Sequence, residues 1–222
     1  MILVMKKTTF YFLFILFSVS LNAQVRAFAG GTYYRHTDFQ ESGYLEVTSG
    51  VDVKVYKFFK PEASISYYFG RLEDYNKLDQ AGNIISISKA NASALNFGFT
   101  PKICLSWSEV SAGDAVLQIL PRYNISRIEA QQNYTLINQS NPAQSKTQKD
   151  IVTEWQHSLG IGLGLDIMLS DKNYNSLAIN LYYTGVDMGE ALTDVKKSNT
   201  HYDSTTLGLG MNYYFGFKKK KV

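Results

Sequence analysis

Apolar and polar residues alternate with a period of two along most of the chain, and helical periodicity is nearly absent. In Leu159–Ile167 a large aliphatic residue stands at every second position, with glycine or aspartate between. A period of two places successive side chains on opposite faces of a β-strand, so we predict an all-β fold. About eight strands, each bounded by turn residues, are predicted: Val25–His36, Tyr44–Tyr56, Glu62–Leu72, Ala92–Trp107, Ala115–Ile128, Thr153–Leu169, Ser176–Val186 and Ser204–Phe217.

The predicted strands are long, and the links between them alternate in length. Strands of globular sheets commonly have ~5–6 residues, whereas a tilted strand that crosses a bilayer needs ~9–11. Most of the predicted strands reach or exceed the second length. Long polar links are His36–Gly43, Arg71–Asn91, Glu129–Val152 and Asp187–Asp203; short links are Lys57–Pro61, Ser108–Asp114 and Ser170–Asn175. This alternation predicts an antiparallel up-and-down barrel with short periplasmic turns, long external loops and both ends of the mature chain on the periplasmic side.

The composition of the polar face distinguishes a membrane barrel from a soluble one. A strand face in water is normally rich in Lys, Glu and Thr, whereas here it is rich in Gly, Ser and Asn, as Gly208, Gly210 and Asn212 show. Small side chains suit the crowded axis of a closed barrel, and glycine only weakens a strand in water. Charged residues are 18% of the chain, against a usual ~25%. We therefore predict a transmembrane β-barrel with its apolar face toward lipid; the alternative is a soluble, lipocalin-like barrel with the apolar face inward.

Aromatic residues, 14% of the chain, fall near the strand ends. Interfacial rings form girdles at both surfaces of a membrane barrel. The outer girdle is predicted to contain Tyr67, Phe69, Tyr123, Trp155 and Tyr183, and the periplasmic girdle Trp107, Tyr213, Phe215 and Phe217.

Two prolines fall inside adjacent predicted strands. Pro101 and Pro121 have no N–H to donate, and a closed barrel has no edge strand on which to place them. We expect a bulge or a locally broken ladder there, with the two prolines opposite each other.

The first 23 residues combine Lys6 and Lys7, the apolar run Phe10–Leu21 and the small residue Ala23. This combination is typical of a secretory signal peptide, and the run is shorter than the roughly 20 residues of a transmembrane helix. We expect cleavage after Ala23, with residues 1–23 as the signal peptide and residues 24–222 as one barrel domain. The net charge is +3, and part of it comes from the two ends of the chain. The sequence has no basic patch interleaved with aromatic residues, so no nucleic-acid partner is expected.

The final segment Leu207–Phe217 (LGLGMNYYFGF) looks like the carboxy-terminal strand that the outer-membrane assembly machinery recognises. The mature chain resembles the small eight-stranded outer-membrane barrels of Gram-negative bacteria, similar to the OmpA and OmpX barrel type. The resemblance implies an outer-membrane location, with outer-membrane lipid and the assembly machinery as partners. Lys218–Val222 follows Phe217 and is interpreted as a solvated tail.

With about eight strands, side chains fill the interior. The predicted interior polar network consists of Glu46, Asp52, Lys54, Glu62, Lys102, Arg122, Glu154 and Asp166. Because both signs are mixed, we interpret it as a salt-bridged structural plug, since buried charges need partners. The alternative is a narrow ion path.

Catalytic chemistry has one weak candidate, His157, predicted on the lipid side near the outer rim. Some barrels of this kind are enzymes on lipid A that use a histidine with a serine and a carboxylate. The outward neighbours of His157 supply no serine, and a base without a nucleophile is a weak site. No metal or cofactor motif is present. We therefore expect a non-enzymatic protein that serves envelope structure or surface contact through loops 71–91, 129–152 and 187–203; a lipid A-modifying enzyme and a small passive channel are the alternatives.

Overall fold

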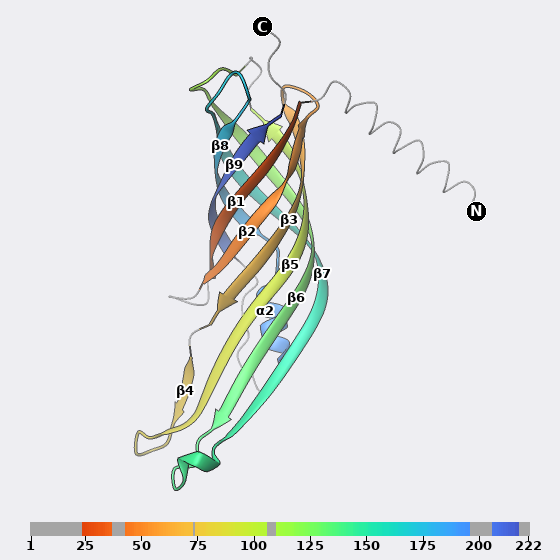
Figure 1. Ribbon diagram of the computed structural model, residues 1–222. Helices are drawn as coiled ribbons and strands as arrows, with labels where there is room; N and C mark the ends of the chain where they lie inside the picture. Colours follow the sequence, from red (N-terminus) through yellow and green to blue (C-terminus); the bar gives the residue numbers. More distant parts are fainter. Residues whose placement is uncertain (1–23, 37–42, 73, 106–109, 196–205, 218–222) are drawn as a thin grey trace, which may run out of the picture.

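The protein is a closed antiparallel β-barrel in this computed structural model (Figure 1). The ring strands are β1 (Gln24–His36), β2 (Gly43–Lys54), β3 (Phe59–Arg71), β5 (Ile84–Cys104), β6 (Ala115–Leu136), β7 (Lys146–Met168), β8 (Ser176–Thr184) and β9 (Thr206–Gly216). They pair in the order β3-β2-β1-β9-β8-β7-β6-β5, and β5 pairs with β3 to close the ring. The predicted eight-stranded up-and-down barrel is therefore confirmed.

The structure describes residues 24–36, 43–72, 74–105, 110–195 and 206–217. The predicted signal peptide, Trp107 and the Lys218–Val222 tail lie outside these ranges. The start of β1 pairs with the end of β9, beside the short turns. We call this the inner end of the barrel and the opposite one the outer end.

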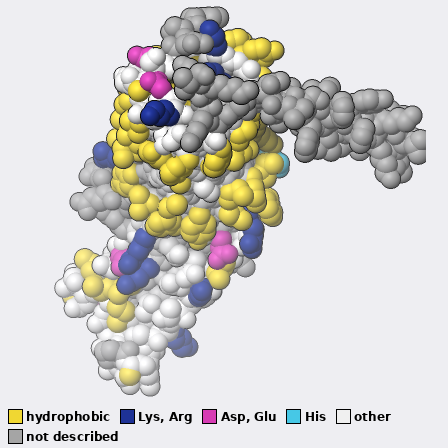
Figure 2. Space-filling view, turned by 45° about the horizontal axis from the view of Figure 1, so that its top comes forward, with side chains coloured by type: hydrophobic (Ala, Val, Ile, Leu, Met, Phe, Trp, Pro, Cys, Tyr) yellow, Lys and Arg dark blue, Asp and Glu magenta, His cyan; other side chains and the backbone are white. Residues whose placement is uncertain are grey.

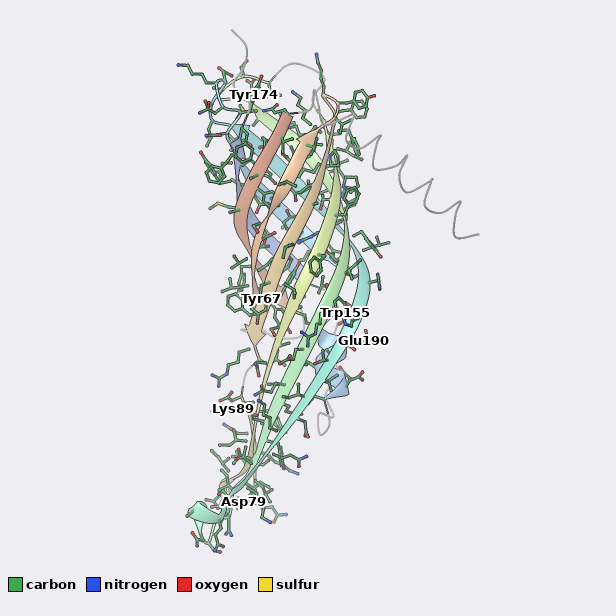
Figure 3. All side chains as sticks on the ribbon, turned by 45° about the vertical axis from the view of Figure 1, so that its right-hand side comes forward. Tyr67, Asp79, Lys89, Trp155, Tyr174 and Glu190 are labelled. Carbon is green, nitrogen blue, oxygen red and sulfur yellow. The ribbon has the colours of Figure 1, made fainter. Side chains whose placement is uncertain are left out.

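Large apolar side chains form a belt on the face of the ring that Figure 2 shows, and large apolar side chains of the other ring strands are exposed as well. Leu159 is 76% exposed and Leu209 is 62% exposed, while the alternate residues of their strands face inward. A soluble barrel would bury these side chains, so the lipocalin-like alternative is wrong. Lipid is the solvent that such a belt requires. The predicted outer girdle is also exposed on this surface, and Tyr67 and Trp155 lie toward the outer end, far from Tyr174 at the inner end (Figure 3).

Three predicted loops contain regular structure, so these predictions were wrong in part. Arg71–Asn91 contains β4 (Tyr75–Leu78) and the start of β5, and Glu129–Val152 contains the outer ends of β6 and β7 around the short 3-10 helix η1 (Pro142–Gln144). These outer segments form a sheet that projects beyond the other strands of the ring (Figure 1). Their two faces do not separate into an apolar and a polar one, and the alternation that marks a membrane strand is therefore lost.

The third of these loops, Asp187–Asp203, contains the helix α2 (Met188–Asp194). No helix in the described segments is long and apolar enough to cross a membrane.

The prolines interrupt one ladder without shifting its register. Pairing between β5 and β6 stops at Phe99–Tyr123 and resumes in the same register at Ile103–Ile119. The unpaired stretch is centred on Pro101 and Pro121, which face each other across the seam. Each still pairs on its other side, Pro101 with Pro61 of β3 and Pro121 with a residue of β7. The expected broken ladder is confirmed, and no bulge forms.

Glycines on the inner face make room for aromatic rings on neighbouring strands. A Cβ atom added at Gly50 would come within 2.7 Å of Phe28 Cε1, and one at Gly162 within 2.7 Å of Tyr182 Cδ1. Each glycine is the direct register partner of its ring, and the same relation recurs across the barrel. The pairs are Phe28–Gly50, Tyr34–Gly208, Tyr44–Gly70 and Tyr182–Gly162.

Gly50→Val therefore destabilises the barrel, because the new side chain overlaps the Phe28 ring and the neighbouring backbone. Overpacking of this kind costs about 1–3 kcal/mol. Urea unfolding in detergent micelles, read by heat-dependent gel mobility, measures the change. The control is Ser49→Val, which adds a similar side chain one residue away on the exposed face. Equal stability of the two variants would contradict the packing described above.

Candidate functional site

The bore of the barrel contains two groups of buried ionic side chains. Near the inner end lies a set of three cations and three carboxylates that we call the inner ionic cluster: Arg26, Lys60, Lys102, Asp52, Glu62 and Asp166. Arg26 makes a two-pronged contact with Asp52, with Nε 2.9 Å from Oδ1 and an Nη atom 2.6 Å from Oδ2. Arg26 also reaches Asp166 across the bore at 3.4 Å. Formal charges within the cluster therefore balance.

Lys102 lies at the centre of the inner ionic cluster. Its ammonium is paired with Glu62, lies 3.3 Å from Asp52 Oδ2 and donates to Tyr214 Oη at 2.7 Å. The same ammonium stands 4.1 Å from the centre of the Tyr214 ring. Lys102 is 1% exposed, and an unpaired charge at such a depth would be strongly disfavoured. The surrounding carboxylates and ring are what make its burial tolerable.

A second ionic layer lies further out and is built around Arg122 and Glu46. Arg122 Nη2 lies 2.5 Å from Glu46 Oε1, and Tyr34 Oη donates to Glu46 Oε2 at 2.8 Å. Arg122 also contacts Ser66 Oγ at 3.4 Å. Asn96 joins this layer by donating to Ser66 Oγ at 3.1 Å. We call this group the middle layer; it is again charge-balanced.

At the outer end of the bore, α2 packs against β5, β6 and β7. Asp187 caps the helix, because its Oδ1 accepts a hydrogen bond from Glu190 N at 2.8 Å. The buried face of the helix packs on small and aliphatic residues of the inner wall, including Ala92 and Ala94 of β5. Gln156 of β7 ties the start of the helix to the wall by accepting from Asp187 N at 2.7 Å. The apolar contacts of this outer plug are Met188, Ala191, Leu192, Val195, Leu72, Ala92, Ala94, Ile128, Ala130 and Val186.

The structure brings six of the eight predicted interior residues into the two ionic layers, and leaves two apart. Lys54 is half-buried and lines a cavity at the inner mouth. Glu154 is half-buried near α2, on the outer side of the Trp155 girdle. Burial, together with repulsion from Glu190, Asp194 and Asp187, raises the pKa of Glu154. Both residues lie near the mouths of the bore, outside the inner ionic cluster and the layer around Arg122 and Glu46.

Sequence reasoning missed Arg26, Lys60 and α2. Arg26 lies in β1 beside the small residues Ala27 and Ala29, where the sequence shows no clear alternation of apolar and polar residues. Lys60 lies in the predicted link Lys57–Pro61. The helix had a readable signal: Asp187 followed three residues later by Glu190 is a capping-box pattern. Met188, Ala191, Leu192 and Val195 after it have helical spacing.

His157 lies on the exposed side of β7, where its Nδ1 is 2.7 Å from Tyr123 Oη. Its cross-strand partner is Ile125, and the adjacent Ser158 lies on the opposite, inner face of the strand. Within the described ranges, no group of three or more His, Cys, Asp or Glu side chains is placed to hold a metal ion.

Three features now define the molecule: a closed ring, an apolar belt and a polar, filled bore. A spanning structure must satisfy its backbone internally, which a closed ring does, and the reversed polarity of its faces is that of barrels in outer membranes. The protein is an eight-stranded outer-membrane β-barrel.

The chain is similar to several solved bacterial structures. The amino-terminal β-barrel domain of Pseudomonas aeruginosa OprF is 15% identical, with a TM-score of 0.34 and coverage of 87% of this chain and 97% of that one. The attachment invasion locus protein Ail of Yersinia pestis is 8% identical (TM-score 0.38; 88% and 97% covered). Neisserial surface protein A is 9% identical (TM-score 0.38; 88% and 97% covered). No protein-family model and no curated protein sequence matches the chain.

Removing one charge of the Arg122–Glu46 pair destabilises the outer-membrane barrel more than removing both charges. Arg122→Met leaves the buried carboxylate of Glu46 without its cation, at a cost of about 3–5 kcal/mol in unfolding free energy. The double variant Arg122→Met/Glu46→Leu recovers much of that loss. Urea titration in lipid vesicles measures both.

The control is Lys89→Met, which removes an exposed ion pair with Asp74 and changes the stability little, because water screens such pairs. A double variant as unstable as Arg122→Met would show that the two charges do not act as a pair.

Proposed function

We propose that this outer-membrane barrel is a non-enzymatic, non-conducting anchor that holds a folded sheet outside the membrane for envelope structure or surface contact. The observation that carries the proposal is the filling of the bore along its length. The inner ionic cluster, the middle layer and the outer plug follow one another from the inner end to the outer end. Two of these layers are charge-balanced, which favours a structural plug over an ion path.

The projecting sheet supports a role at the cell surface. It is formed by β4 and the outer parts of β5, β6 and β7, and extends beyond the other strands of the ring (Figure 1). Several large apolar side chains on this sheet are exposed among polar ones. They include Tyr75, Leu78, Ile84, Leu136 and Ile151. A surface that faces only water does not require exposed apolar groups. Exposed apolar groups on a rigid extracellular scaffold favour contact with another surface.

The enzyme alternative has little support among the described residues. His157 has Tyr123 as its hydrogen-bond partner, and the neighbouring Ser126 and Ser158 stand on inward-facing positions of β6 and β7. A histidine base acts in covalent catalysis through a nucleophile within hydrogen-bond reach. The Tyr123–His157 pair suits an interfacial girdle, in which rings meet the headgroup region.

The purified protein shows no steady single-channel conductance in planar bilayers, because ion pairs and packed side chains occupy the bore. Replacing Met188–Asp194 with a Gly/Ser linker also gives no conductance, since the inner ionic cluster and the middle layer remain. An unrelated open porin in the same bilayers serves as the positive control. Reproducible conductance steps from the unmodified protein would overturn the closed-barrel proposal.

Shortening the projecting sheet removes surface contact without unfolding the barrel. Ala130 and Val152 are register partners, so residues 131–151 can be replaced by an Asn-Gly turn. Cells displaying this variant adhere less to a hydrophobic surface and to a layer of cells that display the intact protein. Heat-dependent gel mobility confirms that the barrel is folded. Undiminished adherence of cells carrying the folded, shortened protein would remove the sheet from the proposed function.

A further inference from the structure

An open groove lies on the outer surface of the barrel, where the projecting sheet leaves the ring. Its volume is about 720 Å³, which falls within the ~300–1,000 Å³ of small-molecule sites. Three neighbouring strands, β3, β5 and β6, supply its wall. The groove is therefore large enough to hold a ligand of several rings or a lipid headgroup.

The register of the three strands explains why the surface is hollow here. Phe69 of β3 pairs with Ser93 of β5, and Ser93 pairs with Glu129 of β6. One pair of residues further out, Arg71 of β3 faces Asn91 of β5. The central strand thus carries short side chains between long ones on both sides. Since neighbouring strands lie ~4.8 Å apart, the floor is roughly 10 Å wide.

One wall of the groove carries two cations that share a carboxylate. Arg71 Nη2 lies 2.7 Å from Asp74 Oδ1, and Lys89 Nζ lies 3.3 Å from Asp74 Oδ2. Both cations are exposed, and among the described residues Asp74 is the carboxylate that pairs with each of them. This wall therefore has one positive charge in excess. Guanidinium and ammonium groups are the usual partners of phosphate in proteins.

The opposite wall and the floor have a different chemistry. Glu129 supplies a carboxylate on β6, and the floor on β5 supplies the amide of Asn91 and the hydroxyl of Ser93. Carboxylate, amide and hydroxyl groups can exchange hydrogen bonds with the hydroxyls of a sugar, whereas a carboxylate repels a phosphate group. The groove thus favours a ligand with a phosphate at the wall of β3 and hydroxyls at the wall of β6.

The groove lies at the level of the membrane surface. Tyr67 and Phe69, two rings of the outer girdle, line its membrane side, and Leu95 continues the exposed apolar surface along β5 toward the membrane. Lys89 lies further out along the projecting sheet than Tyr67 (Figure 3). Because girdle rings mark the headgroup region, a ligand in the groove has the apolar belt on one side and water on the other.

We propose that this groove binds the phosphorylated sugar headgroup of a glycolipid in the outer leaflet. The phosphate contacts Arg71 and Lys89, the sugar hydroxyls contact Glu129 and the floor on β5, and the acyl chains lie along the apolar belt beside Phe69. Clusters of basic residues at a membrane surface recognise anionic headgroups in this way. The site lies at the base of the projecting sheet, so it is independent of any contact that the sheet makes with another surface.

Native mass spectrometry of the folded protein in detergent micelles, titrated with a bis-phosphorylated glucosamine lipid, tests the site. The wild-type protein binds this glycolipid saturably, and Arg71→Gln and Lys89→Gln each weaken binding about fivefold or more, as loss of one charge-assisted contact predicts. Lys77→Gln is the matched control, because Lys77 is an exposed lysine on β4 of the same sheet that does not line the groove. Heat-dependent gel mobility establishes that every variant is folded.

A steric variant tests the groove without changing its charge. Ser93 alternates with Ala92 and Ala94, which are buried in the bore, so Ser93→Tyr places a ring on the floor of the groove and leaves the interior intact. This variant loses saturable binding of the glycolipid. Unchanged binding by folded Ser93→Tyr would show that the lipid lies elsewhere and would overturn the proposal.

Two further ligands test the parts of the headgroup. Phosphatidic acid, a phosphomonoester lipid without a sugar, binds more weakly than the glycolipid, and Glu129→Ala weakens binding of the glycolipid alone. Water-soluble glucosamine phosphate also binds more weakly, because it does not contact the belt. Absence of saturable glycolipid binding, equal binding by Arg71→Gln, Lys89→Gln and Lys77→Gln, or equal affinity for the glycolipid and either of these ligands would overturn the proposal.

Discussion

Charge pairing inside a closed, narrow bore is the constraint on which the rest of this barrel depends. With lipid outside and eight strands around the axis, an interior charge has little water to solvate it. Each must find its counterion on another strand, and the contacts therefore join distant walls. Arg26 of β1 reaches Asp52 on the adjacent strand and Asp166 of β7 across the bore. Since a slip of one residue would turn such a side chain toward lipid, the same pairs specify the register of the sheet.

Steric fit, together with charge pairing, determines which side chains can pack against each other inside the barrel. Interior rings lie over glycines of neighbouring strands, as Phe28 does over Gly50 and Tyr182 over Gly162. A glycine-rich face is therefore the complement of an aromatic one. The alternating glycines between Leu159 and Leu165 have this explanation at Gly162, whereas the aliphatic residues around them contact lipid.

The alternation in the sequence was sufficient to predict the barrel, its orientation of faces and most of its buried charges. The alternation fails to predict strands where a strand does not have one face toward lipid and the other toward the bore. Beyond the girdle the two strand faces are no longer separated into lipid and bore, so the outer parts of β5, β6 and β7 were taken for loops. On β1 small residues occupy lipid-facing positions such as Ala27 and Ala29, so the inward orientation of Arg26 could not be read. Pairing across the bore depends on three-dimensional closure, which no local pattern contains.

The two mouths of the bore differ in chemistry, and this difference limits what the barrel can do. At the outer mouth the apolar face of α2 packs on alanines, whereas several basic side chains line the inner mouth. A solute from the periplasm meets Lys60 and then Lys102 with its carboxylates, and it could pass only by separating those pairs. Separating a buried pair costs several kcal/mol, and the middle layer and outer plug would have to open as well. The bore therefore presents a series of buried contacts, each of which adds to the free energy that the passage of a solute would require.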